Sequence, residues 1–162
     1  MAKRKGGKSL FSLSTLLASF FGAAMIAGAF AYFNYKFSEY KFIDFKEWSF
    51  YEKNDIFLSE AERYIVIFYS SRKKGSMEKL ANLELDTPVL AIDYYNQVHE
   101  NSKNTTFLRA GTNTSLQFIQ RFNIYKVPSL FFIKRIKETL YKQVSMIHKL
   151  NTLENIKEKK YE

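Results

Sequence analysis

Hydrophobic residues form one long uncharged stretch near the N-terminus and several short runs further along the chain. No charged side chain occurs between Ser9 and Tyr35. A helix of that length spans roughly 40 Å, and a bilayer core needs about 20 apolar residues. The pattern therefore predicts one transmembrane helix over residues 9–35, and we assign its contacts with lipid to Leu16, Phe20, Phe21, Gly22, Gly28 and Phe33.

A cleaved signal peptide is the alternative interpretation of this stretch. Ala27-Gly28-Ala29 and Ala29-Phe30-Ala31 both resemble a small-x-small cleavage site. The apolar stretch is longer than the usual core of a signal peptide, which favours a retained anchor.

The short apolar runs that follow predict an α/β domain. Strands are expected at residues 64–69, 89–94, 130–134 and 139–144, and helices at 76–85, 114–122 and 152–160. A short helix is also expected from Asp55 to Arg63. Residues 96–113 are polar and are interpreted as a variable connection. A parallel strand–helix–strand unit followed by a helix, a hairpin and a last helix is the predicted architecture.

Aromatic residues are dense in the segment directly after the apolar stretch. Residues 36–51 contain Phe37, Tyr40, Phe42, Phe45, Trp48, Phe50 and Tyr51. Their spacing fits both a helix face and a strand, so the sequence leaves the choice open. So much apolar surface must be covered, either by the domain's own core or by a partner. The expected organisation is a basic tail (1–8), an anchor (9–35), an aromatic-rich extension (36–62) and a folded domain (63–162).

The charges predict the orientation of the chain in the membrane. Lys3, Arg4, Lys5 and Lys8 precede the apolar stretch, and all 16 acidic residues follow it. Basic residues before a span place the N-terminus in the cytoplasm, so the domain is expected in the periplasm of a bacterial inner membrane. The positive excess of the domain is mild, and we expect no nucleic-acid partner.

The chain has no cysteine and two histidines. It therefore cannot form a disulfide or perform thiol–disulfide exchange. Neither histidine lies in a motif with other metal-binding residues, so we expect no metal and no cofactor.

Val127-Pro128 precedes a buried apolar run, and the loop before it follows a predicted helix. This segment and the order of elements over residues 63–160 resemble the thioredoxin family. The resemblance implies a thioredoxin-like sandwich with a cis proline. Setting Phe68-Tyr69 on the family's Phe-Trp puts its two cysteine positions on Lys73 and Ser76 and its buried acid on Ile67. None of these residues supports redox chemistry, so we expect no enzymatic activity.

The candidate site is a partner-binding surface that consists of two segments. Arg72, Lys73, Lys74, Gly75 and Ser76 form a basic loop before a predicted helix, and Val127 and Pro128 face it in the resemblance. Such a loop could bind an acidic protein segment, a phosphate or a lipid headgroup. Alternatively, it is a solvated basic loop without a ligand.

The expected function follows from the anchor and the missing cysteines. We expect a membrane-anchored, non-catalytic scaffold or accessory subunit that binds a protein partner in a cell-envelope assembly. The bacterial flagellar motor is the assembly we name first, without a residue that specifies it, and a respiratory or secretion complex fits equally. The alternative function is a periplasmic chaperone or assembly factor that binds extended peptides, and a third class is an enzyme of unrelated chemistry.

Overall fold

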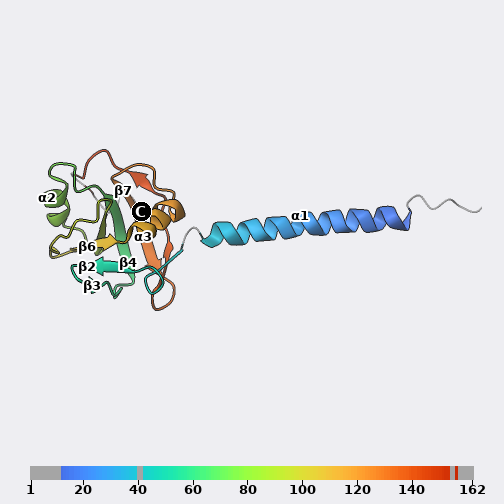
Figure 1. The fold of residues 1–162 in the computed structure, drawn as a ribbon, viewed down its shortest axis with the longest axis horizontal. Coiled ribbons are helices and arrows are strands. Elements are labelled where there is room, and N and C mark those ends of the chain that lie inside the picture. Colours follow the sequence, from blue (N-terminus) through green and yellow to red (C-terminus); the bar gives the residue numbers. More distant parts are fainter. Residues whose placement is uncertain (1–11, 40–41, 154–155, 157–162) are drawn as a thin grey trace, which may run out of the picture. The chain divides into compact units, whose positions relative to one another are not determined.

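The computed structural model describes residues 12–39, 42–153 and 156. The chain divides into two compact units, with the division after Glu39 (Figure 1). The described part of the first unit is a helix, and the second unit contains both strands and helices.

The first unit is helix α1 (Leu13–Glu39). Its segment Leu13–Tyr35 has a mean hydropathy of 1.8 and is long and apolar enough to cross a membrane by length and composition. At 1.5 Å per residue it spans roughly 35 Å, compared with about 30 Å for a hydrocarbon core. The six residues assigned to lipid contacts all lie on α1 and are exposed. The helix prediction is therefore confirmed, and the described helix begins at Leu13.

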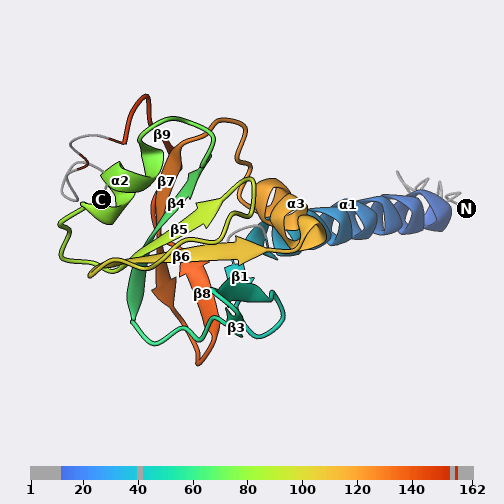
Figure 2. The same ribbon diagram turned by 60° about the vertical axis from the view of Figure 1, so that its left-hand side comes forward.

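The described residues of the second unit form a nine-stranded sheet with two short helices (Figure 2). Its spatial order is β1-β8-β7-β4-β5-β6-β2-β3, and β9 pairs with β7. The elements are β1 (Phe42–Asp44), β2 (Phe50–Glu52), β3 (Asp55–Ile56), β4 (Arg63–Tyr69), α2 (Ser76–Ala81), β5 (Val89–Asp93), β6 (Thr105–Ala110), α3 (Thr112–Arg121), β7 (Ser129–Arg135), β8 (Leu140–Gln143) and β9 (His148–Lys149).

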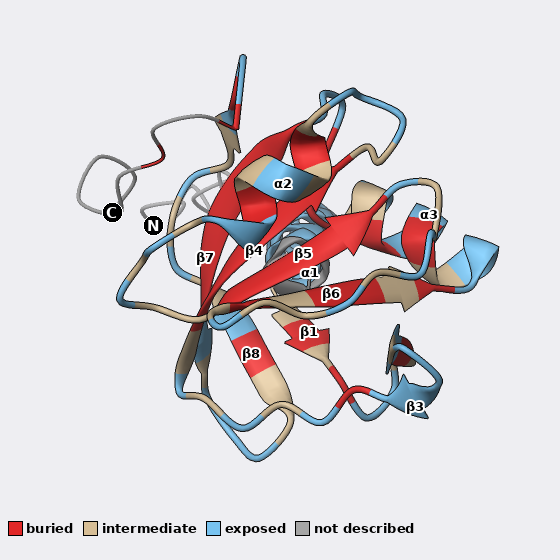
Figure 3. Cartoon of the chain, turned by 90° about the vertical axis from the view of Figure 1, so that its left-hand side faces the viewer, coloured by how far each residue is buried: buried red, intermediate tan, exposed pale blue. Residues whose placement is uncertain are grey.

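The central strands are those that the apolar runs predict. β4 and β5 are parallel, and β4 and β7 are antiparallel with Ile67 opposite Leu130. All three strands are buried over most of their length, as the red ribbons of Figure 3 show. The peptide bond between Val127 and Pro128 is cis, as the resemblance implies. Helix α2 ends at Ala81, four residues earlier than predicted.

Two apolar clusters cover the two faces of the sheet. Phe118 and Phe122 of the α3 segment pack with Phe68 and Phe131 on one face. Leu80 of α2 packs with Ile67 and other strand residues on the opposite face. Leu153 and Ile156 belong to this second cluster, whereas the rest of the helix predicted at 152–160 lies almost entirely outside the described residues.

The structure corrects the predicted extension at residues 36–62. β1 pairs with β8 at one end of the sheet and β2 pairs with β6 near the other, although only five residues separate them in the chain. The sheet must therefore curl, and Phe45 and Phe50 fill its concave side. Of the two coverings considered for the aromatic segment, the domain's own core is the one observed for Phe45 and Phe50. The described sheet begins at Phe42 rather than Arg63.

The helix predicted from Asp55 to Arg63 is wrong. Asp55–Ile56 forms β3, and the following residues run without regular structure to β4. The hydroxyl of Tyr64 accepts hydrogen bonds from the N–H groups of Glu60 and Ala61, both at 2.9 Å. A local side-chain contact thus binds backbone groups that a helix would have used.

The connection predicted at residues 96–113 also contains a strand. β6 pairs in parallel with β5, with Val89 opposite Thr105. Thr105 is buried, and its hydroxyl donates to the carbonyl of Leu80 at 2.9 Å. Thr105 is polar and finds its hydrogen-bond partner only in the folded state. The sequence pattern of β6 therefore resembles that of a loop.

Tyr69 gives the domain an alkaline limit of stability. Its side chain is buried and its hydroxyl donates to Met77 Sδ at 3.0 Å. Burial raises the pKa of Tyr69, and the carboxylate of Asp93 raises it further. The native phenol therefore keeps its proton at a pH where an unfolded tyrosine, with a pKa of about 10, loses it. This contribution is complete below pH ~10 and is lost as the pH rises above it.

We expect the free energy of unfolding to fall above pH ~10 by up to about 1.4 kcal/mol per pH unit for this one proton. Tyr69→Phe should make the decline shallower, and denaturant unfolding at a series of alkaline pH values measures it. Tyr125→Phe, at a side chain that is 68% exposed, is the matched control and should keep the wild-type slope. Equal slopes for Tyr69→Phe and the wild type would contradict the assignment.

Candidate functional site

A groove of about 380 Å³ opens beside the carboxyl ends of β4 and β5 and the chain that enters β7. Phe68 and Ile124, both buried, form its floor together with Ile119 of α3. Exposed side chains form its walls, and these are Tyr94, Leu116, Tyr125 and Val127. The groove is therefore an apolar, aromatic surface that is open to solvent.

The basic loop predicted from the sequence borders this groove. Ser70, the first residue after β4, lines it. Arg72 lies over the ring of Tyr95, with Cζ 3.9 Å from the ring centre. The N–H of Ser71 donates to Asp93 Oδ1 at 2.9 Å, which holds the loop to the end of β5.

Gly75 caps the start of helix α2. It occupies the N-cap position with a φ of 75°. That backbone conformation is in the left-handed region that favours glycine. Ser76, a predicted site residue, is buried, so its side chain faces the protein rather than the groove.

Asn151 joins the two segments of the predicted site. Its carbonyl accepts a hydrogen bond from Lys73 Nζ, and its side-chain Oδ1 accepts one from Lys126 Nζ, both at 3.2 Å. The N–H of Leu150 donates to the carbonyl of Pro128 at 2.9 Å. The loop at Lys73 and the chain at Pro128 therefore lie side by side, as the resemblance predicts.

Val127 and Pro128 differ in what they offer to a ligand. Pro128 is buried, whereas the Val127 side chain is 37% exposed in the groove. Within the described part of the chain, the N–H and C=O of Val127 have no hydrogen-bond partner. A main-chain donor and acceptor without partners beside an apolar groove is what an extended peptide pairs with.

Cations surround the groove. Arg72, Lys73 and Lys74 are exposed on the loop, Lys126 lies in the groove wall, and Lys149 lies over Tyr125 at 4.5 Å from the ring centre. None of the five pairs with a carboxylate among the residues that the structure describes. The buried Asp93 uses its two oxygens for the N–H groups of Ser71 and Gln97. The groove therefore has an uncompensated positive rim.

Sequence reasoning missed the aromatic part of the site. Tyr94 is the last residue of a predicted strand and Tyr95 follows it, and Tyr125 precedes the Val-Pro step. Because the carboxyl ends of parallel strands meet at the same edge, this placement is a signal that could have been used. Leu116 and Asn151 carried no such signal, since only the fold brings them to the groove.

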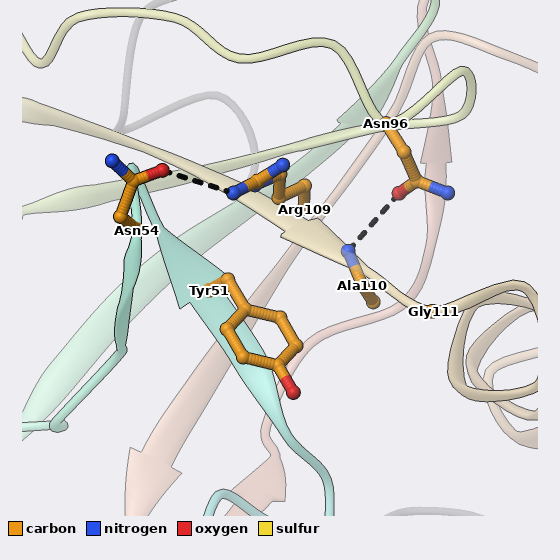
Figure 4. A pocket seen from close by; sticks show the side chains of 6 residues that line it. All are labelled: Tyr51, Asn54, Asn96, Arg109, Ala110 and Gly111. Carbon is orange, nitrogen blue, oxygen red and sulfur yellow. Dashed lines mark hydrogen bonds between the residues drawn. The ribbon is translucent and has the colours of Figure 1, made fainter.

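A second pocket, of about 360 Å³, lies between the β2–β3 turn and the end of β6 (Figure 4). Arg109 Nε donates to the carbonyl of Lys53 at 3.1 Å, and the N–H of Ala110 donates to Asn96 Oδ1 at 3.0 Å. Its polar groups thus bind one another and join the β2–β3 turn to β6. We therefore place the candidate site in the aromatic groove and not in this pocket.

The hydroxyl groups of the groove belong to serine and tyrosine. Among the described residues that line it there is no histidine and no carboxylate. His99 packs its ring against Phe107, with centres 5.8 Å apart, outside the groove. Among the described residues, no group of three or more metal-binding side chains is placed to hold an ion.

The fold and the groove define a mixed α/β domain with a curled sheet, preceded by one apolar helix. Comparison with protein-family models, curated proteins and solved structures finds no match for this chain. The thioredoxin-like fold therefore stays a prediction, based on the order of the elements, the cis Val127–Pro128 bond and the loop that faces it.

Proposed function

We propose that this chain is a single-pass membrane protein whose domain is a non-catalytic, thioredoxin-like binding module. It serves as a scaffold or accessory subunit of a cell-envelope assembly on the periplasmic side of a bacterial inner membrane. The observation that carries the proposal is the aromatic groove, with its positive rim and the unpaired main chain of Val127.

The groove fits an extended segment of a partner protein. The main chain of Val127 can pair with a strand-like peptide. Such main-chain hydrogen bonds supply affinity that does not depend on the peptide's sequence. Tyr94, Leu116 and Tyr125 offer apolar surface for alternate side chains of that segment. Aromatic residues of this kind are enriched at the centres of protein interfaces.

The rim indicates the charge of the partner. Five cations favour a segment with aspartate or glutamate residues beside its apolar anchors, and these are Arg72, Lys73, Lys74, Lys126 and Lys149. Complementary charge of this kind speeds association and excludes basic competitors.

The anchor keeps the module at the membrane surface. Leu13–Tyr35 supports a transmembrane span, and the basic residues before it support a cytoplasmic N-terminus. A tethered module meets a membrane-bound partner at a raised effective concentration, so even a weak groove would be occupied.

Photo-crosslinking from the groove tests this function. Tyr125, 68% exposed in the groove wall, is replaced by a photoreactive phenylalanine in the full chain, and intact membranes are illuminated. We expect one dominant adduct with a protein partner, identified by mass spectrometry. The same replacement at Tyr51, which lines the second pocket and is 38% exposed, is the matched control and should give no such adduct.

The pattern of adducts separates the candidate functions. A smear of many proteins would replace the scaffold by the peptide-binding chaperone, which the unpaired main chain of Val127 also fits. No adduct from Tyr125, or the same adduct from Tyr51, would overturn the site. The identity of a single adduct decides between a flagellar motor, a respiratory complex and a secretion complex.

A further inference from the structure

The domain is attached to the apolar helix by a very short connection. The apolar segment ends at Tyr35, α1 continues for four more residues to Glu39, and β1 begins at Phe42. Four helical residues add about 6 Å, and three Cα–Cα steps add no more than about 11 Å. Phe42 therefore lies within roughly 17 Å of the end of the apolar segment.

That distance is comparable to the thickness of the membrane surface. The headgroup region extends about 5–8 Å beyond each side of the hydrocarbon core. Charges are felt for about another 8 Å at physiological ionic strength. If α1 spans the bilayer, the residues around Phe42 are therefore held where lipid headgroups act on them.

Two cation–aromatic pairs surround this point of attachment. Arg121 lies over the ring of Trp48, with Cζ 5.1 Å from the ring centre, and its Nη1 donates to the carbonyl of Phe42 at 3.5 Å. Lys142 Nζ lies 5.7 Å from the centre of the Phe42 ring. We name Phe42, Trp48, Arg121 and Lys142 the attachment patch.

The patch is part of the folded domain and not a loose segment. Trp48 contacts Phe118 of the core, with ring centres 6.4 Å apart, and Phe42 is paired with Lys142 across β1 and β8. Its position relative to the chain entry at β1 is therefore fixed by the sheet and by α3.

The charge around the patch is positive but small. Lys46 adds a third cation, whereas Asp44 and Glu47 lie in the same segment. The carboxylate of Asp44 is engaged, because its Oδ1 accepts hydrogen bonds from the N–H of Lys46 and the hydroxyl of Thr139. Tryptophan and basic residues side by side are typical of surfaces at the membrane–water interface.

We propose that the attachment patch binds the headgroups of anionic lipids in the membrane that α1 spans. This inference rests on the proposed membrane anchor and is independent of the groove. Binding at the patch fixes the orientation of the domain relative to the membrane, so that the side with the patch faces the lipid.

The single tryptophan of the chain permits a direct test, because it lies in the patch. The full chain is reconstituted in phosphatidylcholine vesicles with or without phosphatidylglycerol, each containing a lipid with a nitroxide on its headgroup. We expect the nitroxide to quench Trp48 fluorescence, and to quench it more strongly when phosphatidylglycerol is present.

Two sets of variants control the measurement. Arg121→Gln and Lys142→Gln should each lower the ratio of lipid-bound to unbound patch by roughly fivefold in the anionic vesicles. Lys103→Gln, at an exposed cation that contacts no patch residue in the described structure, should leave quenching unchanged. The double variant Trp48→Phe/Val98→Trp moves the tryptophan to the exposed β5–β6 connection and should be quenched less.

The outcomes distinguish failure of the anchor from failure of the patch. If the chain does not float with the vesicles, the proposed anchor is wrong. If it floats but Trp48 is quenched no more than the tryptophan at position 98, the patch does not face the lipid. If quenching changes neither with phosphatidylglycerol nor with the two charge substitutions, Trp48 is merely close to the membrane and lipid binding by the patch is overturned. A melting curve for each variant excludes unfolding as the cause.

Discussion

Phe45→Ala is expected to lower the free energy of unfolding of the domain by about 3–5 kcal/mol. Phe45 is buried and its ring lies edge-to-face against Phe50, Phe57 and Tyr141, with centres 5.8, 5.3 and 5.3 Å apart. These contacts join β2, the chain after β3 and β8 across the concave side of the curled sheet. Truncation leaves a cavity where the two ends of the sheet are joined.

Denaturant unfolding of the full chain in a mild detergent, followed by Trp48 fluorescence, measures this change. Leu58→Ala, at a side chain that is 74% exposed, is the matched control and should change stability by less than about 0.5 kcal/mol. Because small domains have a total stability of only about 5–15 kcal/mol, Phe45→Ala can fail to fold, and Phe45→Leu then provides a smaller measurable loss.

A loss below about 1 kcal/mol for Phe45→Ala would be too small for a buried phenylalanine. The aromatic segment after α1 would then lie outside the cooperative core. The curl of the sheet would have to be held by β1 and β2 pairing alone.

Leu116→Asp is expected to reduce the Tyr125 photo-adduct at least about tenfold, which corresponds to ~1.4 kcal/mol of binding free energy. Leu116 projects from α3 into the groove wall and is 51% exposed. A carboxylate there must be desolvated by the partner and repels its acidic residues. Quantitative blotting of the adduct in membranes with equal amounts of each variant measures the loss.

Two further substitutions make this result specific. Leu58→Asp places the same charge on an exposed leucine outside the groove and should leave the adduct unchanged. Leu116→Lys removes the same apolar contact but keeps the rim positive, so an acidic partner should tolerate it better than Leu116→Asp. Equal adduct yields for Leu116→Asp and the wild type would remove the groove from the interface, and a greater loss with Leu116→Lys would reverse the predicted charge of the partner.

Apolar runs with clear boundaries were sufficient to predict the centre of the sheet. The strands are Arg63–Tyr69, Val89–Asp93 and Ser129–Arg135, each bound within one residue of the predicted 64–69, 89–94 and 130–134. Strands that are buried on both faces consist of continuous apolar residues, and no distant contact is needed to recognise them. The Val-Pro step was equally informative, because proline within a sheet is mostly confined to the start of a strand, an edge strand or a bulge. It therefore marked the start of β7.

The strands outside this centre were not predictable in the same way. Thr105 and Arg109 in β6 satisfy their polar groups through Leu80 and Lys53, residues that are distant in the sequence. β1 and β2 are each only three residues long, and both helical and strand spacing fit them. Their conformation depends on pairing with β8 and β6, which a local pattern does not contain.

The candidate site was likewise predictable from the sequence only in part. The basic residues Arg72, Lys73 and Lys74 and the Val127-Pro128 step could be named from the sequence because charge and proline are local signals. The aromatic walls came from three separate segments, at Tyr94, Leu116 and Tyr125. Asn151, which links Lys73 to Lys126, lies 78 residues from the first and 25 from the second.

The sequence by itself determined the apolar helix, the central strands, the absence of thiol chemistry and the basic loop, because each depends on residues that are neighbours in the chain. Only the tertiary structure decided that the aromatic segment closes a curled sheet and that a groove forms beside Val127. The physical reason is that strand pairing, side-chain burial and hydrogen bonds between remote segments are set by the fold as a whole. Composition specifies how much apolar surface must be buried, but not which surfaces meet.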